Sequence, residues 1–478
     1  MALKLARDGV VQLVANVSRA GISFVSLAWF ANVVPREELA ILFLYQAVLG
    51  LASIPASYGL NGAIIKRITE NYSQDQIISA GGILTTVGLS IVIMVLFVGQ
   101  SFINQYLGAD LIIWVLMGLI FAEFKKYLVA ILRGTGHVPT SALIELLQTT
   151  IWAFSAIALI ATGGNPVVLI KTLVGSFVLS SFVGILAVMV LIKPTLVIPE
   201  LKPIKSLLGY AKHNVIAHID SYSYQWADVA ILGIFVTRSS ISGYEVAWRL
   251  TATLVIISRA IESPLFPLLS QYYTEDRHEE FANTYRKSLL VISGVVLPGV
   301  VGIFIFGRQI LEIVFGGYQD IFVILVILLI VRVIESIDRV LKTVLSAVDR
   351  PDLRAKAVLV SLILNVTLNI LLISAFGVIG AAIATTISFS MSTALLFYYV
   401  YNPDVKTHLP KPTVSLTFLW IVVSTSCMSV VGFAIGSAQN INTLLELFMA
   451  ILLTGGAYLI IIILNPKIRQ MVLAEVFQ

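Results

Sequence analysis

The chain has 478 residues, of which 58% are hydrophobic and 12% charged, and its mean hydropathy is +0.96. These values lie far outside the range of soluble domains and predict a polytopic membrane protein. The net charge of +5 comes from basic loops that membrane orientation and anionic headgroups explain, so no nucleic-acid partner is implied. Cys427 is the only cysteine, which excludes an intramolecular disulfide and a cysteine-based metal site; we expect no metal and no cofactor.

Apolar stretches of about 20 residues, long enough to cross a bilayer as helices, recur along the whole chain. We expect no cleavable signal peptide, because the first stretch is long and contains Asn16 and Arg19. The prediction is an all-α protein with about fourteen transmembrane helices, at residues 9–34, 39–60, 79–101, 111–132, 140–162, 167–192, 207–235, 243–270, 286–306, 319–346, 355–374, 377–400, 414–435 and 443–464.

Basic residues are distributed unequally between the two ends of these helices. With the N-terminus inside, 23 of the 31 Lys and Arg fall at cytoplasmic ends, three fall in outer loops and five fall inside helices. Because the retained side of a membrane protein is the positive one, we expect a multi-pass protein of the cytoplasmic membrane with both termini in the cytoplasm.

The first and seventh predicted helices carry matching polar stripes. Their spacing places the polar side chains on one face of each helix, and in so apolar a chain that face cannot look at lipid. We therefore expect a cavity between two related halves. The stripes comprise Gln12, Asn16, Arg19, Ser23 and Ser26 in the first helix, and Asn214, His218, Ser221, Gln225 and Asp228 in the seventh.

A second sign of an internal repeat lies between helices. The segment Leu132–Pro139, after the fourth helix, corresponds to Leu345–Asp352 after the tenth. Each half then holds six helices, an even number, so the two repeats run parallel and are related by an axis along the membrane normal. The predicted domains are residues 1–193, residues 206–400 and two additional helices within 413–478.

The segments Ile131–Gly136 and Phe376–Ala384, together with the 6+6+2 helix pattern and an arginine in the first helix, resemble the polysaccharide-exporter branch of the MOP superfamily. That branch includes Wzx-type O-antigen flippases and, more distantly, lipid II flippases. The resemblance implies a V-shaped pair of helical bundles that flips a polyprenyl-diphosphate-linked oligosaccharide to the outer leaflet. It also implies pathway partners, namely glycosyltransferases and a polymerase or ligase, besides the surrounding membrane lipids.

Arginines in the first and eighth helices are the positions that the lipid II branch places in its cavity, and here these are Arg19, Arg249 and Arg259. A guanidinium group suits a diphosphate because it stays charged and binds two oxygens at once. Glu245 and Glu262 lie about one turn from Arg249 and Arg259, so internal ion pairs remain an alternative for these two arginines.

The remaining polar residues inside the predicted helices suit one of several roles. Gln12, Asn16, Ser23, Asn214 and Gln225 suit hydrogen bonds to sugar hydroxyls; His218 and Asp228 suit either this role or coupling to protons or Na⁺. On the tenth helix, spacings of three and four predict a structural charge network, which comprises Arg332, Glu335 and Arg339.

Two other functions fit parts of the pattern. A multidrug or organic-cation antiporter of the same superfamily would share the fold, but such relatives typically carry acidic cavity residues where this chain has Arg19. A membrane glycan polymerase or glycosyltransferase would be an enzyme and would be expected to carry a large outer loop, whereas the predicted outer loops are only a few residues long.

Overall fold

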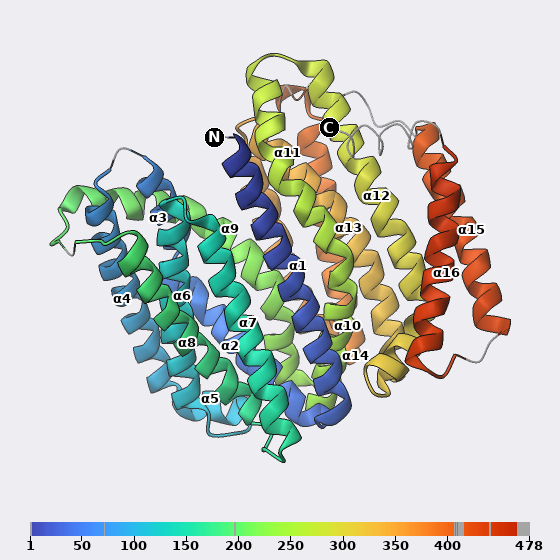
Figure 1. Ribbon diagram of the computed structural model, residues 1–478, viewed down its shortest axis with the longest axis horizontal. Helices are drawn as coiled ribbons and strands as arrows, with labels where there is room; N and C mark the ends of the chain where they lie inside the picture. Colours follow the sequence, from blue (N-terminus) through green and yellow to red (C-terminus); the bar gives the residue numbers. More distant parts are fainter. Residues whose placement is uncertain are drawn as a thin grey trace. The chain divides into compact units, whose positions relative to one another are not determined.

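The computed structural model describes residues 2–70, 72–195, 197–405, 407, 409, 415–438 and 441–465, and within these it leaves aside the side chains of residues 2–7, 213–225, 257 and 263. Every regular element in this part of the chain is a helix (Figure 1). In a membrane this is expected, because a helix satisfies its backbone hydrogen bonds within one segment. The chain is thus an all-α polytopic membrane protein.

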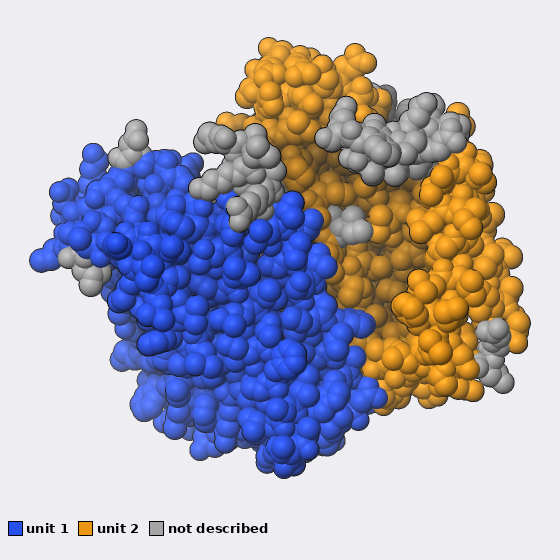
Figure 2. Space-filling model, viewed as in Figure 1, with its two compact units in different colours: residues 1–242 blue, residues 243–478 orange. Residues whose placement is uncertain are grey.

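The helices group into two compact units, residues 1–242 and 243–478, which Figure 2 colours separately. The helices of the first unit are α1 (Ala2–Val33), α2 (Arg36–Ser57), α3 (Leu60–Thr69), α4 (Gln74–Val98), α5 (Gln100–Leu107), α6 (Ile112–Gly134), α7 (Val138–Ala161), α8 (Val168–Leu191) and α9 (Leu201–Phe235).

The boundary between the units falls inside α10 (Arg238–Ala252), which a short 3-10 turn, Thr253–Val255, joins to α11. The remaining helices are α11 (Ile256–Thr274), α12 (His278–Gln309), α13 (Phe322–Ala347), α14 (Pro351–Val400), α15 (Leu416–Ala438) and α16 (Leu444–Ile463). A π-turn at Ile310–Val314 and 3-10 turns at Tyr318–Ile321 and Pro403–Val405 complete this unit.

Twelve of the fourteen predicted spans, all but the eighth and the thirteenth, fall within or largely on one helix or half of one; the eighth, 243–270, covers α10, the 3-10 turn and α11, and the thirteenth corresponds to α15 within the described residues. By length and apolar composition, nine helices of the described residues are able to cross a membrane, and two bent pairs, α5 with α6 and α10 with α11, add two more. α14 is long enough for two spans, as predicted. α13 is absent from this apolar set because it carries the charge cluster. Of α9, the fully described residues include the short apolar stretch Trp226–Phe235.

Three short features were not predicted. α3 is a separate amphipathic helix with Lys66 and Arg67 in its last turn. α5 meets α6 at an angle of 98°, where the Asn104 side chain accepts hydrogen bonds from the backbone of Leu111 and Ile112. α14 is one continuous helical run with a break at Gly377, whose φ of 58° and ψ of −138° suit glycine.

The link between α8 and α9 is fastened to the start of α4. Val197 N–H donates to Ser79 Oγ at 3.2 Å, Glu200 N–H donates to Gln76 Oε1 at 2.8 Å, and Thr195 bonds Asp75 through both its backbone and its hydroxyl group. α9 itself groups with the first unit and packs against α2. The contact units therefore divide the chain later than the predicted repeats, whose boundary at residues 193–206 remains a prediction.

Candidate functional site

The polar stripe of α1 lies on a helix face that is partly exposed. Asn16 is exposed, Gln12, Arg19 and Ser23 are half-buried, and Ser26 is buried with its hydroxyl donating to the Ile22 carbonyl at 2.6 Å. The stripe thus presents amide, guanidinium and hydroxyl groups along most of its length.

Arg19 is held by a carboxylate from a neighbouring helix. Its Nη1 donates to Glu145 Oε2 of α7 at 2.8 Å, and α1 and α7 lie side by side (Figure 1). Arg133, near the end of α6, donates to the same oxygen at 2.9 Å and to Ser141 Oγ at 3.2 Å. The sequence indicated no acidic neighbour of Arg19 on its own helix; the structure supplies one from α7.

Two lysines of α6 extend the charged region of the first unit. Lys125 Nζ donates to Gln148 Oε1 at 3.3 Å, and Gln148 donates to Ser176 Oγ of α8 at 3.0 Å. Lys126 Nζ lies 2.6 Å from Oε1 of the buried Glu123, which also accepts from Ser53. Both lysines lie two turns or more from the end of α6.

The stripe of α9 is only partly described. The side chains of Asn214, His218, Ser221 and Gln225 lie outside the described residues. Asp228 is buried within the first unit. The roles predicted for these residues therefore stay predictions.

Arg249 and Arg259, both predicted to bind the headgroup, have different surroundings. Arg249 Nε donates to the buried Glu245 at 2.9 Å, which is the internal ion pair that the spacing allowed. Glu262, the candidate partner of Arg259, instead pairs with Arg339 at 3.2 Å. Arg259 is exposed, and no hydrogen bond or ion pair of its side chain occurs within the described part of the chain.

The charge cluster of α13 is tightly paired. Buried Arg332 donates to Glu335 at 2.6 Å, to Thr251 Oγ1 at 3.1 Å and to the Trp248 carbonyl at 3.1 Å, and its guanidinium stacks 3.8 Å from the Trp248 ring centroid. Arg339 donates to Glu335 at 2.8 Å. The pairs of Glu335 with Arg332 and Arg339 are those expected from helix spacing, and each of the three guanidinium nitrogens of Arg332 has a hydrogen-bond partner.

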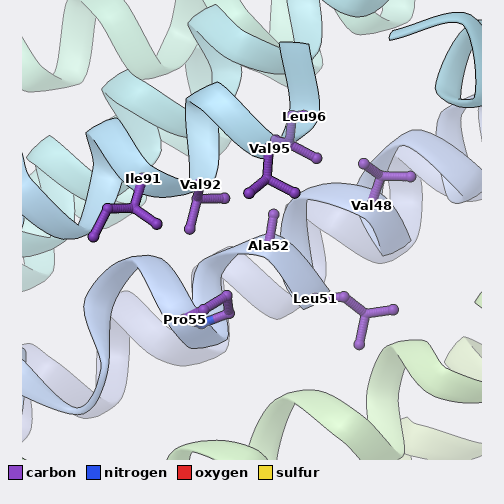
Figure 3. A pocket seen from close by; sticks show the side chains of 8 residues that line it. All are labelled: Val48, Leu51, Ala52, Pro55, Ile91, Val92, Val95 and Leu96. Atoms are coloured by element: carbon purple, nitrogen blue, oxygen red, sulfur yellow. The ribbon is translucent and has the colours of Figure 1, made fainter. Parts of the chain in front are cut away.

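The surface of the first unit also carries an apolar groove between α2 and α4, seen in Figure 3. It has a volume of about 400 Å³ and offers no charge or hydrogen-bond donor for a polar ligand. Among the described residues no cluster of three or more His, Cys, Asp or Glu side chains is placed to hold a metal ion. The groove is lined by Val48, Leu51, Ala52, Pro55, Ile91, Val92, Val95 and Leu96.

Sequence reasoning missed Glu145 as a site residue. It is the sole acidic residue of the predicted fifth helix, which marks it as unusual in an apolar span. Its pairing with Arg19 joins helices that are 126 residues apart in the chain, and no local spacing signals such a contact.

Solved structures of other membrane proteins share the fold of this chain. One is similar over 97% of this chain and 100% of its own, with a TM-score of 0.75 and 16% identity: the lipid II flippase MurJ in an inward closed conformation. Another, an inward-facing multidrug resistance MATE family transporter of the MOP superfamily, matches 84% of this chain and 98% of its own with a TM-score of 0.69 and 15% identity. The fold is that of MOP-superfamily transporters.

The family follows from the sequence comparisons. The family model described as polysaccharide biosynthesis protein matches residues 5–273, and the MatE model matches residues 215–374. Two proteins of Haloferax volcanii are similar over 98% of both chains: the probable low-salt glycan biosynthesis flippase Agl15, at 31% identity, and the probable flippase AglR, at 29%. The chain belongs to the polysaccharide biosynthesis protein family of the MOP superfamily, a group of transporters rather than enzymes.

Proposed function

We propose that this protein is a flippase that moves a polyprenyl-(di)phosphate-linked oligosaccharide from the cytoplasmic to the outer leaflet, for the synthesis of surface polysaccharide or glycoconjugate. The full-length similarity to proteins named as glycan flippases supports this substrate class. The protein would reside in the cytoplasmic membrane with both termini inside, and glycosyltransferases and a polymerase or ligase would act before and after it.

The observation that carries the proposal is an exposed arginine in the bent α10–α11 span, which interacts electrostatically with Glu262 and Glu335 but makes no hydrogen bond to either in the described residues. Arg259 lies in α11, is exposed and makes no ion pair within the described residues. A charged group in a membrane helix is costly unless it serves a polar route or a ligand. A diphosphate with sugars cannot cross hydrocarbon unaided, because removing its water is unfavourable; a guanidinium that lacks an ion-pair partner offers it bidentate hydrogen bonds.

The mechanism in this proposal is alternating access. The two predicted six-helix repeats, residues 1–193 and 206–400, would rock so that the polar stripes face first one side of the membrane and then the other. The lipid tail would stay in the bilayer while Arg19, Arg249 and Arg259 bind the headgroup.

The test is depletion of the protein in its host, with lipid-linked oligosaccharides measured by mass spectrometry and leaflet accessibility measured with an impermeant probe. We expect one species to accumulate on the cytoplasmic leaflet. Complementation with Arg259→Gln should leave at least a tenfold flipping defect at normal protein levels, while Arg308→Gln, an exposed arginine near the end of α12, should restore flipping.

The antiporter is the second candidate, because the MatE model matches residues 215–374. Depletion would then raise retention of cationic dyes without accumulation of a lipid-linked oligosaccharide. That result would refute the flippase proposal.

A further inference from the structure

Side chains from three helices of the first unit meet at one carboxylate oxygen. Glu145 Oε2 of α7 lies 2.8 Å from Arg19 Nη1 of α1 and 2.9 Å from Arg133 Nη2 of α6. The side chains of Arg19, Arg133 and Glu145 are 34%, 32% and 20% exposed to solvent, respectively, so the cluster is partly buried but accessible.

The cluster carries more positive than negative charge. Lys125 of α6 interacts electrostatically with both Glu145 and Arg19, and it donates to Gln148, one turn beyond Glu145 on α7. α8 contributes Ser176, which accepts from Gln148. Lys125 also interacts with Lys126 and with Glu123, which pair with each other at 2.6 Å. Four cations therefore gather around two carboxylates, which leaves a positive surplus that a multiply charged anion would neutralise.

We propose that Arg19, Arg133 and Glu145 form a subsite for a diphosphate headgroup, in which Glu145 occupies the place of a phosphate oxygen until the substrate displaces it. An anionic oxygen held between two guanidinium groups has the charge and the donors that a phosphate oxygen receives from arginines. The inference rests on the proposed function for the identity of the headgroup, and it adds Arg133 and Glu145 to the binding residues.

The position of Glu145 suits a first binding step. It lies seven residues from the start of α7, about 10 Å along the helix axis. In the proposed orientation this is the cytoplasmic end, where the substrate is loaded. Between transport cycles Glu145 neutralises part of the charge of Arg19 and Arg133, and its return to them favours release of the headgroup.

The experiment measures binding of geranylgeranyl diphosphate to the purified protein in nanodiscs. Geranylgeraniol is the uncharged control ligand, and phosphatidylglycerol is the control for anionic lipid in general. Glu145→Gln keeps the shape of the side chain and removes the competing charge, so we expect binding of the diphosphate to tighten about tenfold, the effect of one charge-assisted hydrogen bond. Binding of the two control ligands should not change.

Glu70→Gln is the matched control variant, because Glu70, at the end of α3, pairs with Arg67 at 2.5 Å and Lys66 at 4.0 Å, and has no ion pair with Arg19 or Arg133 in the described residues. It should leave diphosphate affinity at the wild-type value. Arg133→Gln should weaken diphosphate binding about tenfold while leaving geranylgeraniol binding unchanged.

Unchanged or weaker diphosphate binding in folded Glu145→Gln would overturn the proposal, and so would equal tightening toward phosphatidylglycerol. If Glu145→Gln does not fold, Arg133→Gln decides, and wild-type affinity in that variant overturns the proposal. These outcomes are separate from the flippase test: failure here leaves any accumulation on depletion unchanged, and absence of accumulation would refute flipping even if the subsite binds diphosphate.

Discussion

Arginines inside the helices of this protein occupy three kinds of surroundings. Arg332 is buried and each of its guanidinium nitrogens donates a hydrogen bond, Arg19 shares a carboxylate with Arg133, and Arg259 is exposed with no ion pair in the described residues. Composition alone counts these residues as equal charges. Their partners decide which of them stabilise the fold and which are available to a ligand.

Arg332→Gln should lower the stability of the protein strongly. The substitution leaves Glu335 buried with one fewer cation and removes the stack on Trp248, a loss of about 3 kcal/mol or more. The thermal unfolding midpoint in detergent or nanodiscs measures this. The same substitution at Arg308, which is exposed and stacks on Phe322, should change the midpoint little, and equal midpoints for the two variants would contradict the structural role of Arg332.

At the scale of single helices, the sequence predicted the existence of the spans better than their ends and joints. Apolar length placed each of the fourteen predicted spans on helical sequence, because a segment that crosses lipid must be long and apolar. The α3 and α5 helices were missed because short amphipathic turns leave no long apolar run. α1 and α9 extend beyond the predicted limits, since helical backbone continues into polar sequence where hydropathy no longer marks it.

Gly377 is the joint that allows α14 to contain two predicted spans. Gly377→Ala should destabilise the protein by about 1–3 kcal/mol, because a Cβ is strained at this backbone conformation. Gly175→Ala in α8 is the matched control, since nothing lies within 4 Å of the added methyl group, and alanine favours helix. The thermal unfolding midpoint should fall clearly in Gly377→Ala and should change little or rise in Gly175→Ala. Similar midpoint shifts in the two variants would show that the break at Gly377 tolerates a side chain.

At the scale of the whole molecule, the basic-residue asymmetry predicts the topology. In a Cys427→Ser background, Thr237→Cys should react with an impermeant maleimide in intact cells, whereas Glu275→Cys should react only after permeabilisation. Both positions are exposed loop residues, at opposite ends of the α10–α11 span. Reversed labelling would place the termini outside and would also reverse the proposed direction of substrate loading.

The candidate site could be predicted only in part. Arg19 and Arg259 stood out as charges within apolar helices, and the ion pair of Arg249 with Glu245 followed from spacing within one helix. The links from Glu145 to Arg19 and from Glu262 to Arg339 join different helices, so they depend on how the helices pack and not on any local period.

The fastened link between α8 and α9 bears on where the chain can bend. This link has no regular secondary structure, but its backbone N–H groups donate hydrogen bonds to the side chains of Asp75, Gln76 and Ser79 of α4. In addition, α9 packs with the first unit. A segment tied down in this way makes a poor hinge. We expect any hinge needed for transport to lie further along the chain, near the Thr253–Val255 turn, where the helical hydrogen-bond ladder is already interrupted and bending breaks fewer bonds. This expectation narrows the moving part of the second repeat, proposed above as residues 206–400, to the residues that follow α9.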